Sequence, residues 1–143
     1  MTHDLASVTR VGVVGAGTMG SGIWQVAAAA GYDVSMRDID PEYVEDGFET
    51  IEESLGRLTE RGEFTEAEAE ATRERITGTT DLEDLSDCPV IVEAALEDID
   101  VKRDVFADLD EIAPADAVLA TNTSTLSITT IAAATDRPES VVG

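Results

Sequence analysis

The chain has 143 residues, 43% of them hydrophobic, which is enough for one domain with a single core. Its formal net charge is -22, from 31 acidic against 9 basic residues, so nucleic acid and anionic membranes are not expected partners. With one cysteine and one histidine, the sequence excludes an internal disulfide and a Cys/His metal site.

The first predicted elements form a strand-helix-strand unit. The apolar run 8–14 predicts a buried strand, and the stretch GAGTMG joins it to an alanine-rich helix over 18–30. A second strand over 32–37 follows, and it ends at Asp38.

A helical hairpin is predicted next, over about 41–75. Asp40 can cap a helix that begins with Pro41. Thr65 and Glu68 have the spacing of a capping box, which predicts a second, shorter helix. The apolar residues of the first helix recur at steps of four and three, the pattern of a helix that packs on another helix: Val44, Phe48, Ile51, Leu55 and Leu58.

Strands and helices then alternate again. Strands are predicted over 76–79, 89–93 and 117–121, with a further one beginning at 141. Helices are predicted over 100–113 and 127–134, the first with an apolar face of Val101, Val105, Leu109 and Ile112. The predicted fold class is therefore α/β, a Rossmann-type doubly wound and mainly parallel sheet with the helical hairpin inserted.

The glycine-rich turn predicts a binding site for the pyrophosphate of a dinucleotide. Gly15 permits the sharp turn, Gly17 lets a phosphate approach the backbone, and Gly20 lets the helix lie close to the sheet. The N–H groups and the positive dipole end of the helix then face the phosphates. An ordinary structural turn is the alternative. The loop residues predicted to bind the cofactor are Gly15, Ala16, Gly17, Thr18, Met19 and Gly20.

Asp38 is the predicted partner of the adenosine ribose. It follows Gly17 by 21 residues and ends the second strand, where an acid can accept hydrogen bonds from the ribose hydroxyls. A carboxylate there repels a 2′-phosphate, and neither Ile39 nor Asp40 supplies a cation, so NAD is favoured over NADP. Arg37 could turn toward a 2′-phosphate, although we expect it in a surface ion pair.

Several segments together resemble the NAD-binding domain of the 3-hydroxyacyl-CoA dehydrogenases, a family that includes 3-hydroxybutyryl-CoA enzymes. They are VGVVGAGTMGSGIWQVAAAAGYDV with Asp38, the hairpin, VIVEAALEDIDVKRDVFADLDE and ATNTSTLSIT. The resemblance implies an intact enzyme that oxidises 3-hydroxyacyl-CoA to 3-ketoacyl-CoA with NAD, in fatty-acid β-oxidation or butanoate metabolism. It implies an acyl-CoA substrate and allows a homo-oligomer.

The resemblance also implies roles for individual residues. Glu97 and Lys102 would lie near the nicotinamide ribose and the substrate. Ser124 would hydrogen-bond the substrate's 3-oxygen, and Asn122 would help to place the catalytic histidine and the cofactor. Ser54 and Arg61 would touch coenzyme A.

The residues by themselves leave structural alternatives open. Residues 122–124 could cap a helix, and Glu97 with Lys102 could be a solvated ion pair. Ser54, Arg57 and Arg61 share one helical face that could bind an anion. Glu60 and Glu63 lie close in sequence, so a salt-bridged solvent face is the alternative there.

The family's catalytic histidine and glutamate follow the strand that begins near Val141. We expect a flexible tail over 1–7 and an NAD-binding domain over 8–143. The resemblance implies that this domain is truncated before the catalytic histidine and before the helical C-terminal domain. We therefore expect it to be inactive alone. One alternative is a stand-alone NAD-binding regulatory module. Another is a domain of a 3-hydroxyacid or sugar-nucleotide dehydrogenase.

The charge pattern and Cys88 complete the predictions. Acidic residues are interspersed among regularly spaced apolar ones, which favours a folded acidic surface over disorder and predicts a halophilic source. The sequence has neither a long apolar run nor a signal-peptide layout, so a cytoplasmic location is expected. Cys88 precedes Pro89 at the start of an apolar run and is predicted to be a buried, unreactive thiol.

Overall fold

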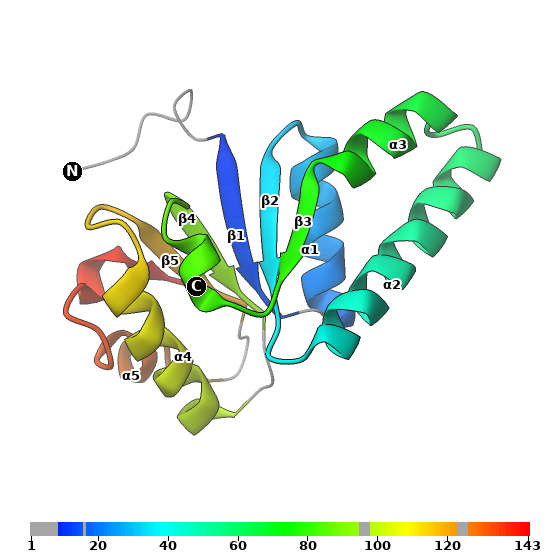
Figure 1. Cartoon of the computed structure of the whole chain (residues 1–143). Coiled ribbons are helices and arrows are strands. Elements are labelled where there is room, and N and C mark those ends of the chain that lie inside the picture. Colours follow the sequence, from blue (N-terminus) through cyan, green and yellow to red (C-terminus); the bar gives the residue numbers. More distant parts are fainter. Residues whose placement is uncertain (1–8, 16, 95–97, 123–125) are drawn as a thin grey trace.

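A computed structural model describes residues 9–15, 17–94, 98–122 and 126–143 (Figure 1). The predicted tail over 1–7 lies outside these residues. The strands are β1 (Arg10–Val14), β2 (Asp33–Arg37), β3 (Ile76–Thr79), β4 (Val90–Glu93), β5 (Val118–Thr121) and β6 (Val141–Val142). In the described part of the chain they form one parallel sheet in the order β3-β2-β1-β4-β5-β6. The order reverses between β1 and β4, which confirms the doubly wound fold.

Helices cover both faces of this sheet. They are α1 (Thr18–Ala29), α2 (Pro41–Glu60), α3 (Glu66–Glu74), α4 (Ile99–Ile112) and α5 (Ile128–Ala132). Figure 1 shows α1, α2 and α3 on one side of the molecule and α4 and α5 on the other. This division follows from right-handed crossovers that run in opposite directions from the centre of the sheet. The connection from β3 to β4 contains a short 3-10 helix, Leu82–Leu85.

The helical hairpin is confirmed down to its caps. The Asp40 carboxylate accepts a hydrogen bond from the Glu42 amide over 2.8 Å at the start of α2. Gly62 follows α2 with a φ of 75°, a backbone conformation that glycine adopts without strain. Thr65 and Glu68 exchange both hydrogen bonds of a capping box at the start of α3.

Two apolar layers hold the helices to the sheet. The layer under α1 and α2 contains Val13, Trp24, Ala28, Val34, Met36, Val44, Ile51, Leu55 and Ile76. The layer under α4 and α5 is centred on Val14, Leu85, Cys88, Ile91, Phe106, Leu109, Leu119 and Ile131. Cys88 is fully buried there, as predicted. Successive residues of each strand alternate between the two layers because side chains of a strand point to opposite faces.

The predicted apolar face of the helix over 100–113 is partly wrong. Val101 is 38% exposed, whereas Lys102, Phe106 and Leu109 are fully buried against the sheet. Leu109 is buried as predicted, and Val105 and Ile112 pack against the same core, so the prediction fails mainly in the first turn, where Lys102 is buried in place of Val101. The apolar pattern could not reveal this, because the residue that enters the core in the first turn of α4 is a lysine.

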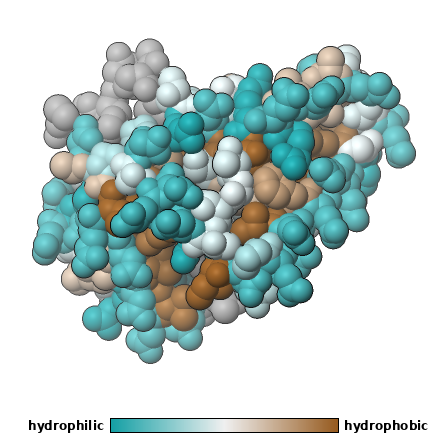
Figure 2. All heavy atoms as spheres, in the orientation of Figure 1, coloured by the Kyte–Doolittle hydropathy of each residue, from teal (hydrophilic) through white to brown (hydrophobic). Residues whose placement is uncertain are grey.

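Hydrophilic residues cover most of the molecular face seen in Figure 2. No helix in the described residues has the length and apolar character that crossing a membrane requires.

Candidate cofactor site

The carboxyl ends of the central strands meet at one edge of the sheet. The strand register pairs Val14 with Arg37 on β2 and with Glu93 on β4. It also pairs Glu93 with Thr121 on β5. The next residue after each strand therefore lies in one row along this edge: Gly15, Asp38, Ala94 and Asn122. In doubly wound sheets, ligands bind at this edge, where the strand order reverses.

Gly15 and Gly20 fix the glycine-rich turn between β1 and α1. Gly15 has a φ of 116°, and its amide donates to the Arg37 carbonyl over 2.8 Å, which ties the turn to the end of β2. A Cβ added at Gly20 would overlap the Gly15 carbonyl group, so only glycine lets the helix lie this close. Gly17 is exposed, and a Cβ added there would meet no atom within 4 Å. Gly15 and Gly20 therefore shape the turn, and Gly17 leaves space above it for a ligand.

The N-cap residue of α1 is a glycine, unlike the cap residues of the other helices. Gly17 is the N-cap residue and supplies no side-chain hydrogen bond, and the first turn carries no acidic residue. By contrast, α2, α3, α4 and α5 are each capped by a side chain, those of Asp40, Thr65, Asp98 and Ser127. The first amides of a helix have no partner within the helix, and they can donate to a phosphate where the cap residue supplies no acceptor of its own. The predicted residues Thr18 and Met19 begin this helix, and Ala16 lies outside the described residues.

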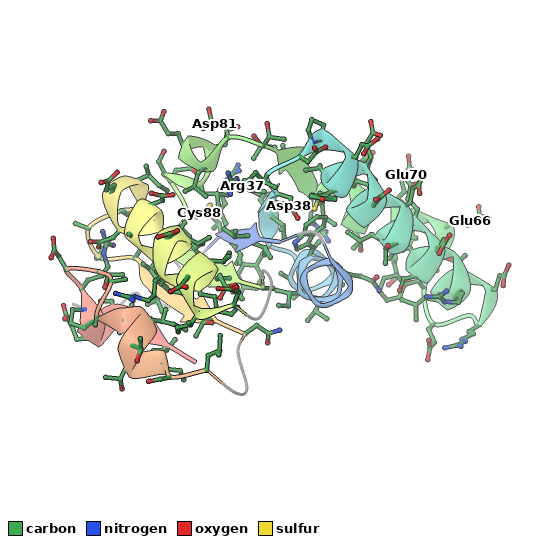
Figure 3. All side chains as sticks on the ribbon, turned by 90° about the horizontal axis from the view of Figure 1, so that it is seen from below. Arg37, Asp38, Glu66, Glu70, Asp81 and Cys88 are labelled. Carbon is green, nitrogen blue, oxygen red and sulfur yellow. The ribbon has the colours of Figure 1, made fainter. Side chains whose placement is uncertain are left out.

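Asp38 lies at the end of β2, beside this turn. Figure 3 views the molecule from the edge where the strands end, and places Asp38 close to the N-terminal end of α1. The Asp38 carboxylate is half-buried and accepts a hydrogen bond from the Ile39 amide over 2.7 Å. The expected ion pair of Arg37 is wrong for the described residues. Its Nε donates instead to the Thr80 carbonyl over 3.2 Å, because β3 ends next to β2 and offers an acceptor there.

Lys102 lies on the other side of the turn, beneath the ends of β4 and β5. Its Nζ is 2.6 Å from Oε2 of Glu93, and the side chains of Lys102 and Glu93 are 1% and 0% exposed. The hydroxyl of Thr121 donates to the second oxygen, Oε1, of the same carboxylate over 2.8 Å. The solvated-pair alternative is therefore wrong for Lys102, because Glu93 draws its ammonium into the protein. Glu97 lies outside the described residues.

Sequence reasoning gave no role to Glu93 or Thr121. The sequence features that bear on Glu93 are its place as an acid at the end of the apolar strand VIVE and the position of the single lysine nine residues later. A charged residue rarely occupies a buried strand position unless it is paired, so the acid indicates a buried partner, but the sequence does not identify that partner.

Asn122 is exposed at the end of β5, in the row of residues at the site edge. Its backbone N–H donates to the Glu93 backbone carbonyl over 2.8 Å. The alternative that Asn122 caps the following helix is not met, because α5 begins at Ile128 and Ser127 caps it. Ser124 lies outside the described residues.

The structure places Ser54 and Arg61 away from the strand ends. Ser54 is on α2 and Arg61 is the C-cap residue that follows it, so they lie about 20 and 30 Å along the helix axis from Pro41, which is near Asp38. Arg57 and Arg61 are exposed, and neither pairs with a carboxylate among the described residues. The salt-bridged alternative for this face is therefore not met within the described part of the chain.

Comparison with known proteins identifies the domain. Residues 10–143 match the family model described as the NAD binding domain of 3-hydroxyacyl-CoA dehydrogenase. The chain belongs to this family. NAD is its cofactor. The glycine-rich turn and Asp38 lie at the edge of the sheet where dinucleotides bind in this fold.

Individual relatives agree with the family assignment. A probable 3-hydroxybutyryl-CoA dehydrogenase of Deinococcus radiodurans is 45% identical over 134 residues, which are 94% of this chain and 48% of the relative. The crystal structure of Mycobacterium tuberculosis FadB2 has a TM-score of 0.92 at 45% identity, covering 94% of this chain and 47% of that one. The (S)-3-hydroxybutyryl-CoA dehydrogenase of Ralstonia eutropha has a TM-score of 0.92 at 40% identity, with 94% and 48% covered. The chain thus spans about half the length of these relatives.

Proposed function

We propose that this chain is the cofactor-binding part of an enzyme that oxidises 3-hydroxyacyl-CoA to 3-ketoacyl-CoA. The observation that carries the proposal is the glycine N-cap of α1 beside Asp38, at the edge where the strand order reverses. NAD supplies the hydride acceptor when bound. The relatives named as 3-hydroxybutyryl-CoA dehydrogenases support an acyl-CoA substrate for the whole enzyme.

Different residues would bind different parts of the cofactor. The amides from Gly15 to Gly20 would bind the pyrophosphate, and the Asp38 carboxylate would accept hydrogen bonds from the adenosine ribose. The nicotinamide half would lie on the side of β4 and β5, near Glu97, Lys102 and Asn122. Ser124 would donate a hydrogen bond to the 3-oxygen of the substrate. Because the residues proposed to hold the cofactor all lie within this chain, we expect the chain alone to bind NAD.

Coenzyme A would extend along α2. Ser54 and Arg61 are seven residues apart and so lie on one face of the helix. Because no described carboxylate neutralises Arg61, its guanidinium is available to a phosphate of the coenzyme.

The cofactor assignment is tested by calorimetry with NAD and NADP. We expect the wild-type chain to bind NAD more tightly than NADP. Asp38→Ala should weaken NAD binding by about tenfold, the effect of one hydrogen-bonded carboxylate. The matched control is Asp33→Ala, which removes an exposed acid at the opposite end of the same strand. If Asp38→Ala binds NAD as the wild type does, the ribose assignment is wrong.

The same proposal covers the setting in which the protein works. We propose a halophilic source with the enzyme in the cytoplasm, and a homo-oligomer for the intact enzyme. The net charge of -22 supports a high-salt environment, and the acidic residues of α2 from Glu42 to Glu60 are exposed.

A further inference from the structure

We infer that Glu93 is a positioning residue for the nicotinamide half of the cofactor, because its carboxylate holds the Lys102 ammonium at the carboxyl ends of β4 and β5. The inference rests on the proposed cofactor function. It concerns a residue that would act through another one, since Glu93 itself is fully buried.

The trio of Glu93, Lys102 and Thr121 lies where the second half of a dinucleotide would go. Asp38 places the adenosine over β2, and the pyrophosphate belongs at the turn after β1. The rest of the molecule must then extend across β1 toward β4 and β5. The strand register puts Glu93 beside Val14, the last residue of β1, and Thr121 beside Glu93. The ion pair therefore lies on the nicotinamide side of the site.

The trio joins three elements through a single carboxylate. Oε2 of Glu93 binds the ammonium from α4 over 2.6 Å, and Oε1 accepts the Thr121 hydroxyl from β5 over 2.8 Å. The Glu93 carbonyl also accepts the amide of Asn122 over 2.8 Å, and the next amide, that of Ala94, donates to the Val14 carbonyl. The contacts of Glu93 thus link the ends of β4 and β5 to the first turn of α4.

Stability alone is a poor reason for this arrangement. Removing two charges from water costs free energy that their attraction only partly returns, and apolar residues of similar size often serve a core equally well. The neighbouring buried residues of α4, Phe106 and Leu109, are apolar. The single lysine of the sequence nevertheless occupies the buried position nearest the strand ends. A positioned positive charge at the site edge accounts for that choice.

The test compares two ligands that differ only in the nicotinamide half. Dissociation constants for NAD and ADP-ribose are measured by calorimetry on the wild type and on Glu93→Gln, which keeps the shape of the side chain. The wild type should prefer NAD. Glu93→Gln should weaken NAD binding by about tenfold, the loss expected when one charge-assisted hydrogen bond is misplaced. The dissociation constant for ADP-ribose should change by less than about twofold.

A matched control separates positioning from general loosening. Asp110→Asn breaks a second sheltered ion pair of α4, between Asp110 and Arg137 at 2.7 Å, eight residues farther along the helix. It should lower the melting temperature and leave the ratio of the two dissociation constants unchanged. If Glu93→Gln does not fold, Glu93→Asp keeps the charge but shortens the reach to Nζ. It should show the same selective loss of NAD affinity.

The inference is overturned if Glu93→Gln loses the same affinity for both ligands, or loses affinity for neither. It is also overturned if the wild type binds NAD no more tightly than ADP-ribose. A wild type that binds neither ligand would instead contradict the proposed cofactor function. The two failures are therefore distinguishable.

Discussion

Thr121 and Lys102 donate to different oxygens of the same carboxylate: the hydroxyl to Oε1 of Glu93 and the ammonium to Oε2. All three side chains are at most 3% exposed. Removing one charge from such a pair leaves the other charge buried without a counter-charge. This lowers the free energy of unfolding far more than replacing both charges by uncharged residues would.

The buried pair gives a stability prediction. Lys102→Met should lower the free energy of unfolding by about 3 kcal/mol, because the Glu93 carboxylate loses its counter-charge inside the protein. The double variant Glu93→Gln with Lys102→Met should recover most of that loss. Glu52→Gln, which breaks an exposed pair with Arg73, is the control and should change stability by less than about 1 kcal/mol. Urea unfolding measures all three. Equal effects for the buried and exposed pairs would contradict the prediction.

The glycine turn predicts opposite outcomes for two substitutions. Gly20→Ala should destabilise the domain by about 1–3 kcal/mol, because its Cβ would overlap the Gly15 carbonyl. Gly17→Ala should fold normally, since its φ of -67° suits alanine and nothing lies within 4 Å of the added Cβ. It should instead weaken NAD binding, because the methyl group occupies the space above the turn.

Melting temperature and calorimetry separate these two effects. Gly22→Ala is the control: it is exposed within α1 with open space around it, and should raise stability by up to about 1 kcal/mol with no change in NAD affinity. A Gly17→Ala variant with unchanged NAD affinity would argue against a pyrophosphate at this turn.

Cys88 gives a prediction for alkaline pH. Burial, and then the neighbouring Asp87 carboxylate, raise the pKa of the Cys88 thiol from its usual 9.0 to about 11. The folded protein therefore keeps the thiol proton at a pH where the unfolded chain has lost it. The stabilising effect is complete below pH 9.0 and is lost as the pH rises toward about 11.

Two measurements check this. Native protein at pH 8 should react with iodoacetamide much more slowly than the urea-unfolded chain. Between pH 9 and 11, Cys88→Ala should lose less stability than the wild type. Identical pH profiles of stability would contradict the raised pKa.

High salt should stabilise the domain. With 31 acidic and 9 basic residues, self-repulsion opposes the compact state at low ionic strength, and counterions screen it. We expect the melting temperature to rise from dilute buffer to molar potassium chloride. The increase should be smaller for a variant in which three exposed acids of α2, Glu45, Glu49 and Glu53, are replaced by glutamine. A melting temperature that does not increase with salt would contradict the proposed halophilic source.

The sequence by itself determined the order of elements and the position of the glycine-rich turn. These features are local: the hairpin caps at Asp40 and Thr65 depend on residues two or three positions away, and the turn depends on the spacing of Gly15, Gly17 and Gly20. The alternation of strand and helix then restricts the topology to a doubly wound sheet, because crossovers are right-handed.

Only the tertiary structure decided what Lys102 does and which face of α4 is buried. The partner of Lys102 is set by the pairing of β4 with β5 and by the packing of α4 on their carboxyl ends, which bring Glu93, Lys102 and Thr121 together from three separate elements. Hydropathy assigns a lysine to the solvent, so no periodic pattern could place this one in the core. A charge becomes a core residue only when the fold supplies its counter-charge, and that is a property of contacts between elements distant in sequence.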